Sequence, residues 1–549
     1  MIRLSVRSVL LSAVLLCTAT AVWGGDEKLA ADLRGSQPQG NVDVIVRYRG
    51  TPTEANHQRV LKGGGALRHR LDFIRSAHYS VSPTLLKNLS DDAEVAYIAP
   101  DRPVHGTLNI TSGTVYSSAA NAAGWTGRGV GVAVIDSGIA DVADFQNGWN
   151  DRIVYAQSFV PSASASYYWS NQTSSTNDQY GHGTHVAGII GADGNGSVYI
   201  GMAPGVNLIN LKVLDQNGAG TDSLVIAAIN QAIQLKNQYN IRIINLSLGR
   251  PVYESAANDP LCQAVEAAWN AGIVVVVAAG NDGRDNSFGS YGYGTITAPG
   301  NDPYVITVGA MNSMGTTTRT DDVMTSYSSK GPTAIDHVVK PDIVAPGNLI
   351  ASVLAPGSTL VQQYPQNQVG SHFVLSGTSM ATPVVSGAVA LLLQQTPSLT
   401  PDQVKARLMR NATKNFPQSS VISDPVTHAS FTVYYDIFTI GAGYLNITAA
   451  LSDNTAAYGA AVSPTAVYNQ ATGQVTLQGV NGQNVVWGSN VVWGTNVVWG
   501  TNVVWGTNVV WGTNVVWGTN VVWGTNVIWG TSSAVASEAS TLLIYGEPF

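Results

Sequence analysis

Short apolar runs alternate with helical stretches of small residues through the middle of the chain. Five such runs occur between residues 130 and 310: V-G-V-A-V-I-D, V-N-L-I-N-L-K-V, I-R-I-I-N-L-S-L, I-V-V-V-V-A-A and Y-V-I-T-V-G-A. Strands that are continuously apolar are buried on both faces, as in a parallel sheet covered by helices. Ligands of such sheets bind beyond the carboxyl ends of the strands. The pattern therefore predicts an α/β unit whose functional residues follow its strands.

A smaller unit is predicted before this one. Residues 42–48 alternate like a half-buried strand, and residues 94–100 form a second such strand. The polar stretch between them has a helical pattern that includes Leu71, Phe73 and Ile74, and it is followed by Leu85, Leu86 and Leu89. This arrangement predicts an α+β fold.

The N-terminus predicts export. Arg3 and Arg7 precede an apolar run over 9–16, which is typical of a signal peptide and too short for a permanent membrane helix. No later run is long enough to span a bilayer. Cys17 suggests a lipoprotein as the alternative, but the bulky Leu16 before it favours cleavage. After cleavage only Cys262 remains, so no internal disulfide is expected.

An internal repeat fills residues 484–531, which are eight hexads close to N-V-V-W-G-T without a charged residue. An extended hexad array keeps its register, and its Gly-Thr-Asn steps supply turns, so we expect short strands in a meander or a stacked coil. Two hypotheses stay open: a stiff, aggregation-prone spacer, or an anchor to a surface or substrate. The partner of such a tail is unknown.

Three segments carry candidate chemistry: V-A-V-I-D-S-G at 132–138, G-H-G-T-H-V-A-G at 181–188 and S-G-T-S-M-A-T-P at 376–383. Asp136 ends an apolar strand, where an isolated Asp is usually a turn or cap. His182 opens a helix between two glycines that allow close backbone approach. His185 follows at i+3, but no acidic or cysteine partner completes a zinc spacing, so His185 is interpreted as structural.

Ser379 begins an apolar helix in which Pro383 is expected to be tolerated within the first turn. Ser379 could simply cap this helix. A helix N-terminus also offers free N–H groups to an oxyanion formed beside that serine. Asn281 follows the strand at 273–279, and its amide could donate to the same oxyanion.

Together these segments resemble the subtilase family through about residues 120–450, ending with G-A-G-Y-L-N at 441–446. The order Asp, His, Ser is that of subtilisins. The resemblance implies that Asp136 orients the imidazole, His182 acts as general base and acid, and Ser379 attacks the carbonyl. It also implies an oxyanion hole of Asn281 and the Ser379 N–H.

The resemblance further implies substrate-binding segments. The implied pocket walls are Ser247, Leu248 and Gly249 on one side and Ala279 and Gly280 on the other, and the implied edge strand is Gly218, Ala219 and Gly220. Thr297 stands where many members have glycine at the pocket floor, which implies a narrower pocket.

The family's inhibitory propeptide is similar to residues 42–101, so mature enzyme is expected to start near His105. The expected domains are a signal peptide at 1–25, an inhibitory propeptide at 26–104, a catalytic domain at 105–452 and a hexad-repeat region at 453–549. The expected fold is a subtilisin-like parallel sheet with helices on both faces, preceded by a small α+β propeptide and followed by a β-rich repeat tail. Structural calcium is compatible with the family, and Asp144, Asp193 and Asn195 lie in suitable loops, but the loop at 194–199 departs from the family pattern, so no ligand is assigned.

The predicted function is a secreted serine endopeptidase that forms an acyl-enzyme and is made as an autoprocessed zymogen. Its expected partners are polypeptide substrates and its own propeptide, and its chemistry requires no cofactor. The net charge of −7 argues against nucleic acid as a partner. One alternative is a catalytically inactive subtilase-like scaffold with a binding tail. Another alternative is an esterase, but this chain lacks the G-x-S-x-G elbow of esterases around Ser379.

Overall fold

The computed structural model describes residues 26–30, 33–34, 40–101, 103–106, 114–147, 150–162, 174–195, 199–287, 289–424, 429–469, 474–479, 544 and 546–547. The predicted signal peptide and the eight hexads lie outside the described residues, so both stay predictions.

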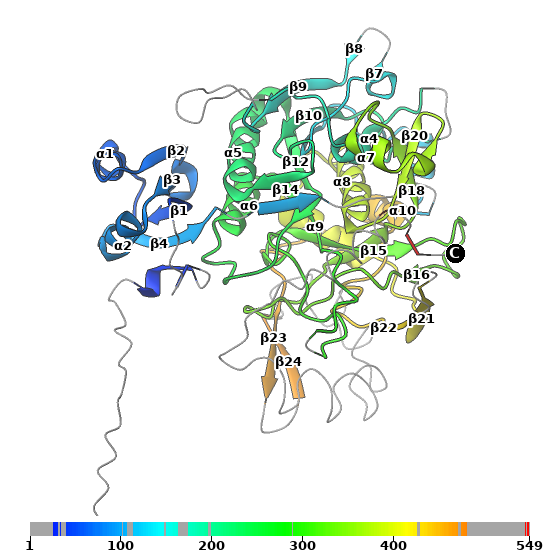
Figure 1. Cartoon of the computed structure of the whole chain (residues 1–549). Helices are drawn as coiled ribbons and strands as arrows, with labels where there is room; N and C mark the ends of the chain where they lie inside the picture. The colour runs from blue at the N-terminus through cyan, green and yellow to red at the C-terminus, as the bar shows by residue number, and fades with distance from the viewer. Residues whose placement is uncertain are drawn as a thin grey trace, which may run out of the picture.

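The N-terminal unit is an α+β fold, drawn in blue in Figure 1. Its antiparallel sheet has the order β2-β3-β1-β4. The elements are β1 (Val42–Tyr48), α1 (Glu54–Lys62), β2 (Ala66–Leu71), β3 (Ser76–Val81), α2 (Pro83–Asp91) and β4 (Val95–Pro100). The two predicted strands are confirmed as the neighbouring strands β1 and β4.

The helical pattern predicted around Leu71 is wrong, because β2 ends at Leu71 and a single 3-10 turn, η2 (Asp72–Ile74), leads to β3. Leu71 and Ile74 are buried together with the core of the main unit, and η2 contacts helix α6 (Pro260–Asn270) of that unit. These two residues are therefore apolar because they pack against another part of the chain. The spacing of apolar residues along a short stretch of sequence does not reveal such a contact.

The main unit contains a sheet of eight strands in the order β16-β15-β14-β12-β6-β10-β9, with β17 also paired to β15. All pairs are parallel except β15 with β16. The strands are β6 (Gly131–Asp136), β9 (Ile153–Ser158), β10 (Asn207–Lys212), β12 (Ile241–Leu246), β14 (Val274–Ala278), β15 (Ile306–Asn312), β16 (Val323–Met324) and β17 (Ile343–Pro346). Five of these are the five predicted apolar runs, and the predicted parallel sheet is confirmed.

Helices cover both faces of this sheet (Figure 1). Helices α4 (His182–Gly191) and α8 (Thr378–Gln395) pack together on one face, and α5 (Asp222–Tyr239) packs with α6 on the other. The remaining helices are α3 (Ser117–Ala122), α7 (Thr359–Gln363), α9 (Pro401–Asn411) and α10 (Ile447–Ser452). Small sheets and hairpins are formed by β7 (Gln146–Asn147) with β8 (Asn150–Asp151), β18 (Ile350–Val353) with β20 (His372–Leu375) and β19 (Gln368–Val369), and β21 (Ser419–Ser423) with β22 (Ser430–Tyr434).

The main unit continues past residue 452, where the catalytic domain was expected to end. Arg410 Nε donates to Asp453 Oδ2 at 2.7 Å, and Ser463 Oγ donates to the buried Asp342 Oδ1 at 2.6 Å. The hairpin of β23 (Thr465–Asn469) and β24 (Gln474–Gln478) joins the unit through a bridge between Thr465 and Val338. The described residues 453–469 therefore belong structurally to the main unit.

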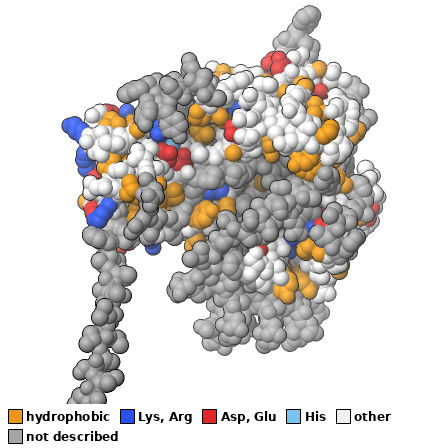
Figure 2. All heavy atoms as spheres, viewed as in Figure 1, with side chains coloured by type: hydrophobic (Ala, Val, Ile, Leu, Met, Phe, Trp, Pro, Cys, Tyr) orange, Lys and Arg blue, Asp and Glu red, His pale blue; other side chains and the backbone are white. Residues whose placement is uncertain are grey.

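The described surface is unevenly charged. In the view of Figure 2, basic and acidic side chains gather on the N-terminal unit, whereas the described face of the main unit is mostly uncharged. No helix in the described ranges is both long and apolar enough to cross a membrane. Cys262 is a buried free cysteine on α6.

Candidate active site

Asp136 and His182 form a buried hydrogen-bonded pair at the carboxyl edge of the sheet. Asp136 is the last residue of β6, and His182 is the first residue of α4. Asp136 Oδ1 lies 2.6 Å from His182 Nδ1, and both side chains are at most 1% exposed. Because a carboxylate only accepts, Nδ1 carries the proton and Nε2 is the basic nitrogen of the ring.

Glycine allows this pair to form. A Cβ on Gly183 would lie 2.2 Å from the Gly138 carbonyl oxygen and 3.1 Å from the Asp136 Cβ. Gly181 has φ +110°, a conformation that side chains with a Cβ rarely adopt. The predicted close approach of the backbone around His182 is therefore confirmed.

Asp178 is a site residue that the sequence analysis missed. Its fully buried carboxylate accepts from Ser137 Oγ at 2.8 Å, from the Gly181 N–H at 2.7 Å and from the Thr184 N–H at 2.8 Å. It thus joins the loop after Asp136 to the first turn of α4, where the helix dipole favours an anion. Burial raises the pKa of Asp178, while these hydrogen bonds oppose the shift. The signal was an acidic residue four positions before His182.

Ser379 is the second residue of α8, and Gly377 occupies the N-cap position. Helix capping is therefore not the role of Ser379, and that alternative is wrong. The Ser379 Oγ instead donates to the Ser247 carbonyl oxygen at 3.1 Å, and Ser247 lies just beyond β12. Since β12 and β6 are adjacent and α8 packs on α4, Ser379 and the Asp136–His182 pair share one edge of the sheet.

The expectation that Pro383 lies in the first turn of the helix is also wrong, because Pro383 is the sixth residue of α8. A proline at this position leaves the carbonyl four residues earlier without an intrahelical donor. That carbonyl belongs to Ser379, and Ser247 Oγ donates to it at 2.7 Å. Ser247 and Ser379 are therefore joined by two reciprocal hydrogen bonds, and Ser247 compensates for the proline.

Asn281 follows β14 and faces the start of α8. Its Oδ1 accepts from the Thr378 N–H at 2.9 Å and from Thr378 Oγ1 at 3.2 Å. A backbone N–H can only donate, so the oxygen end of the amide is fixed towards Thr378 and Nδ2 is the end that can donate elsewhere. The side chain therefore lies next to the residue that precedes Ser379.

Two of the three segments expected to bind substrate lie on either side of another strand. β11 (Ala219–Thr221) and β13 (Leu248–Gly249) both pair antiparallel with β5 (Pro103–Gly106), which comes from the end of the expected propeptide. His105 is in register with both Ala219 and Gly249. The chain's own residues 103–106 thus occupy the position of an extended peptide, and the expected boundary at 104 falls inside β5.

Thr297 lies against the expected pocket walls. A Cβ on Gly249 would be 2.6 Å from Thr297 Oγ1, and a Cβ on Gly280 would be 2.8 Å from Thr297 Cγ2. The Thr297 N–H also donates to the Ala279 carbonyl oxygen at 3.0 Å. The half-buried Thr297 side chain therefore fills space between the two walls.

His185 is held inside the protein. Its Nε2 lies 3.2 Å from the Ile350 carbonyl oxygen and 3.0 Å from that of Phe373, and burial lowers its pKa to about 3. The interpretation of His185 as a structural residue is therefore supported.

Of the loop residues considered for calcium, Asp193 and Asp144 are joined by a backbone hydrogen bond. The described ranges contain no group of three His, Cys, Asp or Glu residues suited to a metal. These residues therefore do not define a set of calcium ligands.

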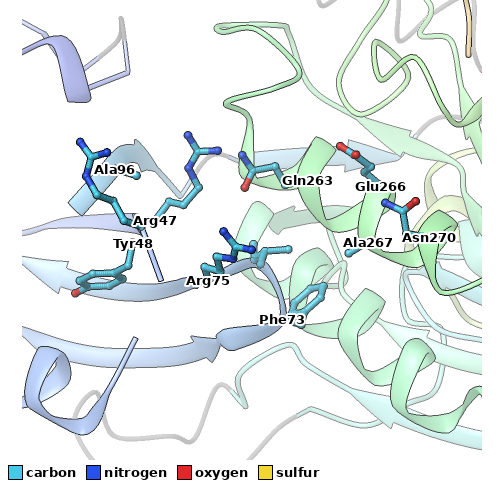
Figure 3. Close-up of a pocket in the computed structure, with 11 residues that line it drawn as sticks. Arg47, Tyr48, Phe73, Arg75, Ala96, Gln263, Glu266, Ala267 and Asn270 are labelled. Atoms are coloured by element: carbon cyan, nitrogen blue, oxygen red, sulfur yellow. The ribbon is translucent and has the colours of Figure 1, made fainter. Parts of the chain in front are cut away.

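A groove of about 560 Å³ separates the N-terminal unit from α6, away from the Asp136–His182 pair. Figure 3 shows Arg47 and Arg75 on one side and Glu266 on the other. Beside it, Arg47 donates to the Ala257 carbonyl oxygen at 3.3 Å. Asp101 accepts from the N–H and the Oγ of Ser223, both at 2.6 Å, in the first turn of α5. The N-terminal unit is therefore held to the main unit by specific polar contacts.

Comparisons with known proteins match this region. Residues 127–425, a range that includes Asp136, His182, Asn281 and Ser379, match the family described as "Subtilase family". The chain is 39% identical over 359 residues to "Serine protease AprX" of Bacillus subtilis, which covers 63% of this chain and 76% of that protein. It is 35% identical over 353 residues to "Subtilisin E" of the same species, covering 64% and 78%. It is 36% identical over 388 residues to "Extracellular serine proteinase" of Thermus sp., covering 68% and 79%.

We expect Gly183→Ala to destabilise the protein by about 1–3 kcal/mol, because the new methyl group must push α4 away from the Gly138 carbonyl. Peptide hydrolysis should fall by roughly 10²-fold if the His182 ring moves by about 1 Å. Thermal unfolding and kcat/KM measure the two effects. Gly129→Ala is the control for backbone strain without a clash, because Gly129 has φ +83° but a Cβ there would meet no atom within 4 Å. It should cost some stability and leave peptide hydrolysis unchanged. Equal losses in both variants would contradict the steric role of Gly183.

Proposed function

Because this chain belongs to the subtilase family and is a subtilisin-like serine endopeptidase, we propose that Asp136, His182 and Ser379 are its catalytic triad. The observation that carries this assignment is the buried 2.6 Å hydrogen bond between Asp136 and His182. It lies at the sheet edge where Ser379 lies in the first turn of α8. The comparisons support peptide-bond hydrolysis. An inactive scaffold is not favoured, since all three side chains are retained in subtilisin order.

In the proposed reaction, Ser379 Oγ attacks the scissile carbonyl carbon while its proton passes to His182 Nε2. His182 then gives this proton to the leaving amine, and an acyl-enzyme on Ser379 remains. A water molecule attacks the acyl group in the second half of the reaction, with His182 again acting as base and then as acid. Asp136 keeps the proton on Nδ1 and stabilises the imidazolium. These steps need no cofactor.

The developing oxyanion is proposed to bind at the start of α8. Asn281 Nδ2 and the Ser379 N–H are the donors, and the positive end of the helix dipole adds to their field. The amide of Asn281 suits this role because Thr378 holds its oxygen. No reorganisation of the amide is then needed when charge develops on the substrate.

Substrate is proposed to bind as an extended strand between β11 and β13. The position of β5 supports this assignment, since an extended peptide already pairs with both strands. The primary pocket is proposed to lie between Ser247–Gly249 and Ala279–Gly280, with Thr297 limiting its depth. Small side chains before the scissile bond are therefore the proposed preference.

The chain is further proposed to be a secreted zymogen. The predicted signal peptide supports export, and the name of the Thermus relative describes that protein as extracellular. The place of β5 between the substrate-binding strands supports inhibition by the N-terminal unit, because substrate and β5 would compete for the same hydrogen bonds. Processing is then proposed to occur beyond Gly106, slightly later than the expected start near His105.

Ser379→Ala should abolish hydrolysis, lowering kcat by at least about 10⁴-fold, because the nucleophile is lost. The variant should also keep its N-terminal unit attached, since maturation is autocatalytic. Intact mass and hydrolysis of a chromogenic peptide measure both results. Ser398→Ala changes an exposed serine just beyond α8 and serves as the control. Active enzyme of mature size from Ser379→Ala would refute the assignment.

Asp101→Asn should release inhibition sooner, because it weakens charge-assisted hydrogen bonds to the first turn of α5 by roughly tenfold in equilibrium constant. The measurement is the lag before freshly purified full-length chain becomes active. Asp91→Asn is the matched control, since Asp91 is half exposed and pairs with Lys87 within the N-terminal unit. A lag that both variants leave unchanged would argue against Asp101 as an inhibitory contact.

Thr297→Gly should enlarge the primary pocket. We expect kcat/KM for substrates with Phe or Leu before the scissile bond to rise by roughly tenfold or more relative to Ala substrates. Cleavage of matched peptides measures this ratio. Thr297→Ser removes only the methyl group and should give an intermediate ratio. A ratio that stays constant across the three proteins would remove Thr297 from the pocket.

A further inference from the structure

The chain returns to the main unit after the hexads. Ile544 is 5% exposed and Glu547 is 1% exposed, although both follow a region predicted to be a separate tail. In Figure 1 this segment, drawn in red, lies beside β16 and β18, far from the N-terminal unit. Its burial requires a dedicated site on the main unit.

The Glu547 carboxylate is bound by several donors. Its Oε1 accepts from the Ser326 N–H at 2.9 Å and from Ser326 Oγ, and it lies 3.0 Å from Arg284 Nη2. The Arg284 side chain is 6% exposed, pairs with Asp424 at 2.6 Å through its other nitrogen and stacks on the Phe431 ring. The buried Arg284 guanidinium thus pairs with two carboxylates, those of Asp424 and Glu547. It therefore favours an acidic side chain at position 547.

Two asparagines bind the main chain of the same segment. Asn348 Nδ2 donates to the Glu547 carbonyl oxygen, and the Glu547 N–H donates to Asn348 Oδ1, both at 2.9 Å. Asn367 Nδ2 donates to the Ile544 carbonyl oxygen at 2.7 Å. Asn348 therefore pairs with Glu547 as a neighbouring strand would, which holds the segment in place through its backbone.

Gly546 sets a second requirement. It has φ +65°, and a Cβ at this position would lie 2.5 Å from Ser376 Oγ and 2.7 Å from a methyl group of Leu349. Both the conformation and the contact exclude larger residues. The site therefore requires glycine followed by glutamate.

The bound segment touches the regions that carry the candidate catalytic groups. Ser376, which Gly546 contacts, lies three residues before Ser379, and Arg284 lies three residues after Asn281. Ser376 Oγ also accepts from the Leu349 N–H at 3.1 Å, and Ser376 and Asn348 share a further hydrogen bond. Docking of the segment thus connects the start of α8 with the loop that follows Asn281.

We propose that Ile544, Gly546 and Glu547 form a docking motif. Its receptor recess in the same chain is formed by Arg284, Ser326, Asn348, Leu349, Asn367 and Ser376. Occupancy of this recess stabilises the main unit next to the active site. It also fastens the chain on both sides of residues 480–543, because the β23–β24 hairpin joins the main unit on the other side.

The test uses the full chain with Ser379→Ala, so that it stays intact. In this background Glu547→Gln should lower the unfolding midpoint by roughly 2–4 °C, because a buried charge-assisted contact to Arg284 is lost. Glu538→Gln is the control, because it removes the same charge nine positions earlier in the chain, outside the proposed motif. Equal midpoints for the two variants would overturn the proposal.

Binding is tested separately with the full chain lacking residues 544–549. A synthetic peptide of sequence T-L-L-I-Y-G-E-P-F should bind it and raise its unfolding midpoint, whereas peptides with Gly546→Ala or Glu547→Gln should bind at least about tenfold more weakly. Equal binding of the three peptides would overturn the proposal, as would a failure of the native peptide to bind. A concentration-dependent dimer of the intact chain that Glu547→Gln abolishes would show docking between two copies and would overturn docking within one chain.

Discussion

The close approach of helices α4 and α8 to the carboxyl edge of the parallel sheet is the constraint on which the active site depends. Gly183 places the first turn of α4 against the Gly138 carbonyl, so the His182 ring meets Asp136 at the end of β6. On α8, Gly377 is the N-cap residue, so Ser379 lies in the first turn of the helix. Both helices begin at the same edge, so their N-terminal N–H groups and positive dipole ends face the same region.

Buried polar groups behind the site are hydrogen-bonded to one another, and this network holds Ser379, the proposed nucleophile, in place. Ser386 Oγ donates to Asn245 Oδ1 at 2.8 Å, and Asn245 Nδ2 donates to Ser247 Oγ at 3.0 Å. Ser247 in turn supplies the donor that Pro383 withholds from the Ser379 carbonyl. In a low-dielectric interior such a connected chain of hydrogen bonds is costly to break. At α4, the Asp178 carboxylate has a similar role, because it accepts hydrogen bonds from Ser137 and from the N–H groups at the start of the helix.

Segments from both sides of the main unit complete it. Residues 103–106 extend between β11 and β13, and residues 544–547 enter the recess beside Ser376. In each case the main unit satisfies backbone groups of the segment, by strand pairing in the first case and by asparagine side chains in the second. The two sites are separate, so the C-terminal contact does not depend on the N-terminal unit.

The sequence by itself determined the parallel sheet, the position of the candidate residues at the ends of its strands, and the order of the proposed triad. It could do so because strands buried on both faces are continuously apolar, and that pattern is local. Tertiary structure alone decided the strand that replaced a predicted helix before Leu71, the compensation of Pro383, the role of Asp178 and the docking of Glu547. These features join residues that are distant in the chain: 132 positions separate Ser247 from Ser379, and 263 separate Arg284 from Glu547. No local period records such contacts, because each depends on where the fold brings two remote segments together.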